Sequence, residues 1–274
     1  MSLQSIELAA GTSIPQLGLG VFQVVPEVTE STVEKALRAG YRHIDTAAIY
    51  GNEAEVGKAV AGSDLDRSDI FVTTKLWNSE QGFETTLAAF EKSRAALGLD
   101  VIDLYLIHWP TPERDKFVDS WRALEKLQAD GAVRAIGVSN FRVVDLQRLL
   151  DEGLSTPSIN QIELHPYLAQ PELREFHRKH GIVTEAWSPL GRGGAILTDP
   201  VVTSIAAELD ASAAQVLIAW QLAIGNVVIP RSTNVSRISE NLAAAEITLT
   251  ADQLNLLNSL DRAERIGPDP ADLN

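Results

Sequence analysis

Short apolar runs alternate with longer amphipathic stretches along most of the chain. The run from Val101 to Ile107 is almost continuously apolar, which is typical of a strand buried on both faces of a parallel sheet. Seven further short runs are rich in apolar and β-branched residues. The eight predicted strands are Leu17–Gly20, His43–Asp45, Phe71–Leu76, Ile102–His108, Ala135–Ser139, Ile159–Glu163, Val183–Ala186 and Asn226–Ile229.

Helical periodicity fills the stretches between these strands. Phe83, Leu87 and Phe90 fall on one face of a helix, and Phe117 and Trp121 do so in the next helical stretch. Glycine follows five of these stretches, where a left-handed end cap favours it. These glycines are Gly40, Gly98, Gly131, Gly153 and Gly181. Eight repeats of strand and helix predict an α/β fold, the parallel (β/α)8 TIM barrel.

Both ends of the chain add elements to this barrel. The segment Ser5–Pro15 predicts a β-hairpin across the base of the barrel, with Ala10-Gly11-Thr12 at its turn. Near the other end, Ala251–Leu260 predicts an extra helix, and Arg265–Asn274 predicts a loop or tail rich in proline and aspartate. Since no linker-like segment interrupts the body, we expect residues 1–274 to form a single domain.

Composition narrows the possible partners. The 274 residues carry a formal net charge of −14, which argues against nucleic-acid binding because phosphates require a basic surface. The absence of cysteine excludes disulfides and thiolate chemistry. No apolar run approaches the ~20 residues that cross a bilayer, and the first residues lack a secretory signal pattern. We therefore expect a cytoplasmic protein without a membrane partner.

Ionisable side chains gather at the ends of three neighbouring predicted strands. Asp45 ends the second strand, Lys75 lies near the end of the third and His108 ends the fourth, while Tyr50 follows Asp45 by five residues. The carboxyl ends of barrel strands share one mouth, so we expect these groups to meet there. Asp45 with Lys75 alone would equally suit a structural ion pair, but the set of four favours a catalytic site.

The chemistry of this set points to carbonyl reduction. A nearby cation lowers the pKa of a phenol, so we expect Lys75, held by Asp45, to lower the pKa of Tyr50. Tyr50 would then act as a general acid toward a carbonyl oxygen, which His108 would orient through a hydrogen bond. None of these groups is a strong carbon nucleophile, so the electrons must come from another source, and a nicotinamide cofactor would supply them.

Candidate cofactor residues lie elsewhere on the same rim. No strand–GxGxxG–helix pattern is present, which disfavours a Rossmann domain. Barrels commonly hold phosphate with the loops after strands seven and eight, here Trp187–Gly194 and Pro230–Asn234, and Arg231 and Arg237 supply cations there. The residues expected to hold a nicotinamide, by hydrogen bonds to its carboxamide and by stacking, are Ser139, Asn140, Gln161 and Trp187.

Aromatic residues after the first, third and fourth strands, Phe22, Trp77 and Trp109, should wall a substrate pocket. His177 and His180 lie three residues apart on an outer helix, without further ligands nearby. We expect both to be solvated surface residues rather than metal ligands, and we expect no metal site.

Three segments together resemble the aldo-keto reductase family: Gly40–Glu53, Asp103–Pro110 and Ile136–Phe141. The resemblance extends over essentially the whole chain, and Trp187 makes it most similar to the bacterial 2,5-diketo-D-gluconate reductase branch. It implies a monomer that uses NADPH to reduce aldehydes and ketones, such as small carbonyls, α-keto esters, diketones or keto-sugar acids.

The resemblance also assigns residues. It implies that the catalytic tetrad is Asp45, Tyr50, Lys75 and His108. Arg231 replaces a lysine that is usual in the family, and Asn234 stands where some relatives have another arginine, so we expect NADPH to be preferred and NADH to be a weaker alternative. The implied cofactor-binding residues are Ser139, Asn140, Gln161, Trp187, Ser188, Leu190, Gly191, Arg231, Ser232, Thr233, Asn234, Arg237, Glu240 and Asn241.

Two other functions remain open on the residues alone. Lys75 could form a Schiff base in a lyase, although such a lysine must be uncharged to attack and Asp45 would keep it protonated. Alternatively, the barrel could bind the cofactor without catalysis and regulate a partner.

Overall fold

A parallel sheet of eight strands forms the centre of the computed structural model, which describes residues 4–8 and 11–274. Its strands are β3 (Leu19–Gly20), β4 (His43–Asp45), β5 (Phe71–Leu76), β6 (Ile102–Ile107), β7 (Val133–Ser139), β8 (Ile159–Glu163), β9 (Val183–Trp187) and β10 (Val227–Val228). They are hydrogen-bonded in chain order, and a parallel bridge between Leu17 and Val228 joins the first edge of the sheet to the last. The predicted barrel is confirmed.

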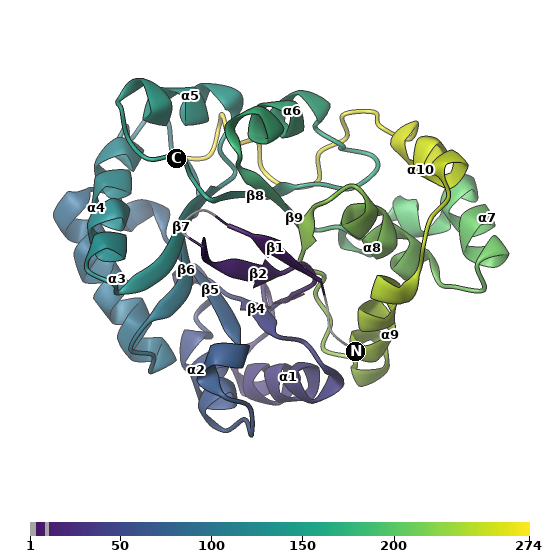
Figure 1. Ribbon diagram of the computed structural model, residues 1–274, viewed down its shortest axis with the longest axis horizontal. Coiled ribbons are helices and arrows are strands. Elements are labelled where there is room, and N and C mark those ends of the chain that lie inside the picture. The colour runs from purple at the N-terminus through teal and green to yellow at the C-terminus, as the bar shows by residue number, and fades with distance from the viewer. Residues whose placement is uncertain (1–3, 9–10) are drawn as a thin grey trace.

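Helices surround the strands as an outer ring (Figure 1). They are α1 (Pro26–Ala39), α2 (Glu53–Ala61), α3 (Phe83–Leu97), α4 (Phe117–Ala129), α5 (Val143–Asp151), α6 (Pro171–His180), α7 (Pro200–Glu208), α8 (Ala213–Ala223), α9 (Val235–Ala243) and α10 (Ala251–Asn258). Most of the core lies between this ring and the sheet, because the helices direct apolar side chains toward the sheet. Helix α8 differs in that six consecutive residues, 216–221, are buried. The five glycines predicted to follow helices all have left-handed backbone, with φ between 64° and 118°.

The predicted hairpin closes the base of the barrel. Strand β1 (Ser5–Glu7) pairs with β2 (Ser13–Pro15) in antiparallel register, with Ile6 opposite Ile14. Ile14 is fully buried and packs in a separate apolar cluster with residues such as Leu104 and Leu106 inside the barrel. Ala10 of the predicted turn lies outside the described residues. The amino-terminal end of the barrel is thus filled with apolar side chains.

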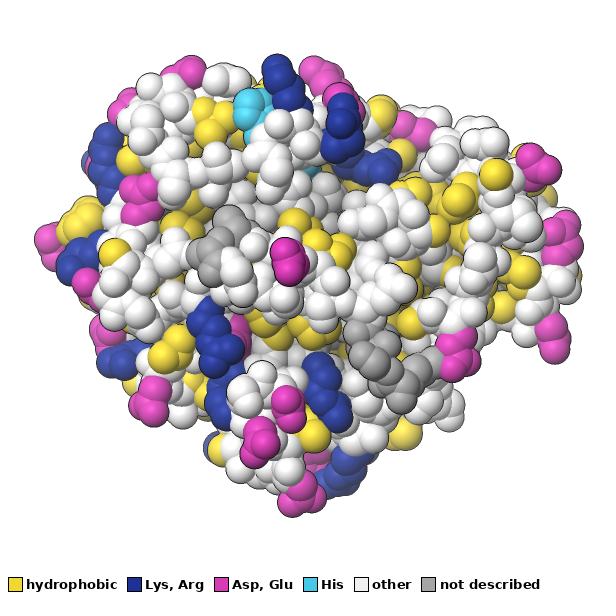
Figure 2. Space-filling model, viewed as in Figure 1, with side chains coloured by type: hydrophobic (Ala, Val, Ile, Leu, Met, Phe, Trp, Pro, Cys, Tyr) yellow, Lys and Arg dark blue, Asp and Glu magenta, His cyan; other side chains and the backbone are white. Residues whose placement is uncertain are grey.

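Figure 2 shows the face that carries the hairpin, with acidic and basic side chains distributed around it. A cavity of about 660 Å³ opens on this face, lined in part by Arg42, Asp103 and Arg134. Asp103 is paired with Arg67 at 2.5 Å and with Arg134 at 3.4 Å, so these charges already compensate one another. The cavity lies at the amino ends of the strands, whereas the predicted catalytic residues lie at the carboxyl ends.

One sequence-based interpretation is wrong. His177 is only 1% exposed, and not a solvated surface residue. Its Nε2 accepts a hydrogen bond from the amide of Asn160 at 3.0 Å, and its Nδ1 lies 2.9 Å from the hydroxyl of Thr184. The reason is the i, i+4 spacing of His177 from Leu173, which places both on the buried face of α6. His180 is half-buried and stacks on Phe176.

Within the described residues, no single helix has the length and apolarity needed to span a membrane. Helices α7 and α8 meet these criteria only as a pair, and the chain bends by 90° between them.

Candidate active site

The carboxyl ends of β4, β5 and β6 bring the predicted tetrad together. Asp45 is the last residue of β4, Lys75 is the fifth residue of β5 and His108 directly follows β6. Tyr50 ends a short 3-10 helix, Ala48–Tyr50, in the loop after β4. The parallel register of adjacent strands places their carboxyl ends at the same height, so the side chains converge at one mouth.

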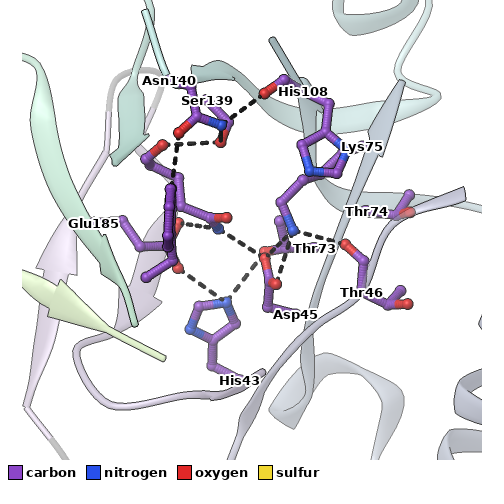
Figure 3. A network of polar contacts seen from close by, with 12 residues as sticks. His43, Asp45, Thr46, Thr73, Thr74, Lys75, His108, Ser139, Asn140 and Glu185 are labelled. Carbon is purple, nitrogen blue, oxygen red and sulfur yellow. Dashed lines mark hydrogen bonds and ion pairs between the residues drawn. The ribbon is translucent and has the colours of Figure 1, made fainter. Parts of the chain in front are cut away.

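Lys75 is fully buried, and all three N–H bonds of its ammonium group are donated to oxygen atoms. It donates to the two carboxylate oxygens of Asp45 at 2.8 and 2.7 Å and to the carbonyl oxygen of Thr46 at 2.9 Å (Figure 3). Burial lowers the pKa of Lys75, but the charge and hydrogen bonds of Asp45 outweigh this effect and raise its pKa overall. Burial also raises the pKa of Asp45, while the charge of Lys75 and the hydrogen bonds from Lys75 and Gln161 act in the opposite direction. We interpret the pair as a charged ammonium held by an ionised carboxylate.

Tyr50 lies over this cation. The Nζ atom of Lys75 is 5.2 Å from the centroid of the phenol ring, which is itself partly exposed at the mouth. The surrounding protein desolvates the hydroxyl and raises the pKa of Tyr50 to about 12, although Lys75 acts in the opposite direction. Our expectation of a lowered pKa is therefore wrong: in this site, desolvation of the phenolate outweighs the attraction of the ammonium.

His108 is a neutral imidazole. Burial and then the charge of Lys75 lower its pKa well below the usual value, so the ring is uncharged at neutral pH. Its Nδ1 is buried without a hydrogen-bond partner among the described residues. An uncharged ring keeps one N–H that can donate to a ligand oxygen.

Aromatic rings line the approach to these groups. The ring of Phe22 lies 5.0 Å from that of Tyr50, and the rings of Trp77 and Trp109 lie 5.3 and 6.3 Å from that of His108. Phe22 is 44% exposed, which places it at the outer edge of the mouth. The structure thus gathers the three predicted pocket walls around the phenol and the imidazole.

Hydrogen bonds tie the predicted carboxamide-reading residues into one frame. The indole Nε1 of Trp187 donates to the Oδ1 of Asn140 at 2.8 Å, and the amide nitrogen of Asn140 donates to the hydroxyl of Ser139 and the carbonyl oxygen of His108. Ser139 donates to the carbonyl oxygen of Gln161 at 2.8 Å. The frame connects residues of β7, β8 and β9 with the loops that follow β6 and β7.

Strained backbone accompanies this frame. Asn140 has φ of 62° and Ser188 has φ of 50°, both in the left-handed region that non-glycine residues rarely adopt. Such residues concentrate at binding and catalytic sites, where the surroundings hold them in place. Two residues of the rim are therefore held in conformations that a free chain would avoid.

The two predicted phosphate loops lie on the same rim. Asn234 caps α9 by accepting a hydrogen bond from the backbone N–H of Arg237 at 3.2 Å, and Arg231 reaches the carbonyl oxygen of Phe22 at 3.4 Å. In the other loop, Gly191 has φ of 56°, and a Cβ there would lie 2.7 Å from Ile196. The remaining predicted contacts are the half-buried Ser188, Leu190, Ser232 and Glu240, the exposed Thr233 and the buried Asn241.

Sequence reasoning missed two buried glutamates beside this frame. Glu185 of β9 lies inside the barrel, next to Gln161 and Asp45. Glu163 of β8 accepts hydrogen bonds from the backbone N–H groups of Ile266 at 2.7 Å and Gly267 at 2.8 Å, and so anchors the C-terminal tail. The signal available in both cases was a glutamate within a predicted central strand of a parallel barrel, where strands are expected to be buried.

No group of three or more histidine, aspartate and glutamate side chains is placed to hold a metal ion within residues 4–8 and 11–274.

Comparisons with known proteins agree with this geometry. The family model "Aldo/keto reductase family" matches residues 11–262. An aldo-keto reductase from Mycobacterium sp. (strain JLS) is 53% identical, covering 100% of this chain and 99% of that protein, and a glyoxal reductase from Bacillus subtilis (strain 168) is 48% identical, covering 98% and 97%. The crystal structure of a Gox0644 mutant in complex with NADPH matches with a TM-score of 0.96 and 44% identity over 100% of both chains. The chain belongs to the aldo/keto reductase family.

Proposed function

We propose that this protein is an NADPH-dependent reductase of small aldehydes and ketones, with Tyr50 as the proton donor. The observation that supports the proposal most directly is the ammonium of Lys75, paired with Asp45 and 5.2 Å from the ring of Tyr50, with the ring of His108 5.7 Å from that of Tyr50. A charged lysine, a phenol and a neutral imidazole around one opening suit a carbonyl oxygen that gains negative charge.

The residues of the rim fit NADPH. Both N–H bonds of the Gln161 amide are donated to carboxyl oxygens, which leaves its own oxygen to accept from a carboxamide. A hydrogen bond to Asn140 holds the indole of Trp187 in place, and the exposed Arg231 and Arg237 offer cations for phosphates. When bound, the cofactor would supply the hydride. The NADPH complex of Gox0644 supports this choice of cofactor.

The protein side chains would handle the oxygen of the substrate. His108 donates a hydrogen bond to the carbonyl oxygen and orients it, and Tyr50 transfers its proton to that oxygen as negative charge develops there. The phenolate that remains is stabilised by the ammonium of Lys75. A phenol is a stronger acid than the alcohol that forms, so the transfer runs downhill even though burial raises the pKa of Tyr50 to about 12.

The pocket walls favour small, partly apolar carbonyl compounds. Phe22, Trp77 and Trp109 offer aromatic surface on the approach, while the polar groups lie at its inner end. We propose dicarbonyls and α-keto esters first, since a 48% identical relative is a glyoxal reductase. Keto-sugar acids are the next class to examine. We also propose that the protein acts as a monomer formed by a single domain of residues 1–274.

A Schiff-base lyase is a weaker proposal. All three N–H bonds of Lys75 are donated to oxygens of Asp45 and Thr46, and the raised pKa keeps the amine charged. An attacking lysine needs a free lone pair. Borohydride treatment with a carbonyl substrate would trap a lysine adduct in a lyase, and we expect none here.

The decisive experiment follows the loss of NADPH absorbance with a panel of aldehydes, dicarbonyls, α-keto esters and keto-sugar acids, and repeats it with NADH. We expect turnover of at least one dicarbonyl or α-keto ester with NADPH and slower turnover with NADH. If NADPH binds in a fluorescence titration but no carbonyl is reduced, the protein is a binding barrel and the proposal fails.

A further inference from the structure

The barrel interior holds a second buried carboxyl group beside the Asp45–Lys75 pair. Glu185 is 0% exposed, and its Oε2 accepts a hydrogen bond from the Nε2 of Gln161 at 3.0 Å. The same Nε2 donates to the Oδ2 of Asp45 at 2.8 Å. One amide therefore bridges two carboxyl groups, and Figure 3 shows Glu185 at the left of this network and Asp45 nearer its centre, below Lys75.

The groups around Glu185 provide too little positive charge for two carboxylates. Strand β4 contributes His43 and Asp45, and β5 contributes Lys75. Strand β8 contributes the uncharged Gln161, and the neighbour of Glu185 on β10 is the apolar Val227. Lys75 is already neutralised by Asp45.

His43 does not supply the missing charge. Burial, and then the ammonium of Lys75, lower the pKa of His43 to about 3, so its ring is neutral. Its Nε2 lies 3.1 Å from the hydroxyl of Thr73 and 3.7 Å from the Oε1 of Glu185, and this oxygen has no hydrogen-bond partner within residues 4–8 and 11–274. An ionised Glu185 would leave an uncompensated charge in the interior, which is strongly unfavourable. Burial, and then the negative charge of Asp45, raise the pKa of Glu185 to about 8.

We propose that Glu185 is a positioning residue of the reductase site, which holds a proton of its own and thereby keeps Asp45 the sole ionised carboxyl group opposite Lys75. Its Oε2 fixes the amide of Gln161, so that the amide oxygen remains available to the nicotinamide carboxamide. The inference deepens the proposed function and rests on it.

The pH dependence of the reaction follows from this arrangement. Loss of the proton from Glu185 would add a negative charge beside Asp45 and Tyr50, which makes the phenolate of Tyr50 less favourable. Tyr50 then becomes a weaker acid, and carbonyl reduction slows as the pH rises. Glu185, and not Tyr50 itself, would therefore set the alkaline limb of the pH profile.

The first test detects the proton without any catalysis. Infrared spectra at pH 7 should contain a carbonyl band of a protonated carboxylic acid that disappears in Glu185→Gln. The matched control is Glu163→Gln in the adjacent strand. Burial raises the pKa of Glu163, but hydrogen bonds from His165 and from the tail lower it overall, so this control has no such band to lose. A wild-type spectrum from which Glu185→Gln removes no band overturns the inference.

The second test compares pH profiles of kcat/KM. Glu185→Gln keeps an oxygen for Gln161 and mimics the protonated acid, so we expect the alkaline limb of kcat/KM to begin about one pH unit higher than in wild type. Glu185→Leu removes the hydrogen bond, and we expect it to weaken NADPH binding about tenfold because one amide hydrogen of Gln161 is left unpaired.

These outcomes separate the two proposals. An alkaline limb that is identical in wild type and Glu185→Gln contradicts the role of Glu185, whatever the stability of the variant. If wild type reduces no carbonyl compound, the proposed function fails, but the infrared band still decides whether Glu185 holds a proton.

Discussion

The hydroxyl of Tyr50, beside the ammonium of Lys75, is the proposed proton donor of the reaction. We expect Tyr50→Phe to reduce carbonyl turnover by a factor of about 100 or more, because the proton donor is lost. NADPH affinity should stay close to that of wild type, since the ring and its packing against Phe22 remain. Steady-state kinetics and a fluorescence titration measure the two quantities. An equal loss of both would contradict the assigned role.

Glu185 also affects the stability of the folded protein. Its pKa is raised from 4.5 to about 8 on folding, so between these values the folded state binds more protons than the unfolded state. Glu185 therefore contributes a fall in the free energy of unfolding as the pH rises through this window, by at most about 1.4 kcal/mol per pH unit. We expect Glu185→Gln to remove this fall. Denaturant titrations of both proteins at pH 5, 7 and 9 test the prediction, and a constant difference between them would refute it.

At the scale of elements, the start of α9 and the loop before it form the basic part of the rim. Arg237 lies in the first turn of α9, the end of a helix at which the backbone N–H groups and the helix dipole favour an anion. We expect Arg237→Ala to weaken NADPH at least tenfold more than NADH, because only NADPH carries the additional phosphate. The control is Arg38→Ala, which removes an exposed arginine from α1 that is not among the predicted cofactor-binding residues. Parallel weakening of both cofactors by Arg237→Ala would show that the residue does not read this phosphate.

The C-terminal tail is a second element that bears on cofactor binding. A Cβ at Gly267 would lie 2.4 Å from the Cη2 of Trp187, so the two groups must separate if it is added. We expect Gly267→Ala to displace the indole, change its fluorescence and weaken NADPH binding about tenfold. Asp272→Ala in the exposed end of the tail should change neither. If Gly267→Ala binds NADPH as tightly as wild type, the tail has moved away from Trp187 and the indole has kept its position.

The elements themselves were largely predictable, and the contacts between them were not. The meeting of Asp45, Lys75 and His108 could be predicted because each lies at the carboxyl end of a strand, and these ends share one face of a parallel barrel. The anchor between Glu163 and the tail joins residues more than 100 positions apart, and no local pattern encodes it. The burial of His177 and the raised pKa of Tyr50 depend on packing density, which periodicity does not report.

At the scale of the whole molecule, an apolar cluster that stabilises the fold lies at one end of the barrel, and the candidate active site lies at the other. The fully buried Ile14 plugs the amino-terminal end, and the polar network fills the carboxyl end. We expect Ile14→Ala to reduce the free energy of unfolding by about 2–4 kcal/mol through the cavity it creates. NADPH affinity should remain that of wild type. Denaturant unfolding and a cofactor titration would expose any coupling between the two ends, which would contradict this division.

The left-handed backbone of Asn140 and Ser188 has a practical consequence for engineering. Such conformations cost about 1 kcal/mol or more at a non-glycine residue, so the rim is held slightly above its relaxed energy by the rest of the fold. Ser188→Gly would remove this conformational cost and raise thermal stability, but it would also make the loop after β9 more flexible. Selection for heat resistance alone would therefore favour glycine at Ser188 and disfavour it at Asn140, whose side chain makes three hydrogen bonds in the rim.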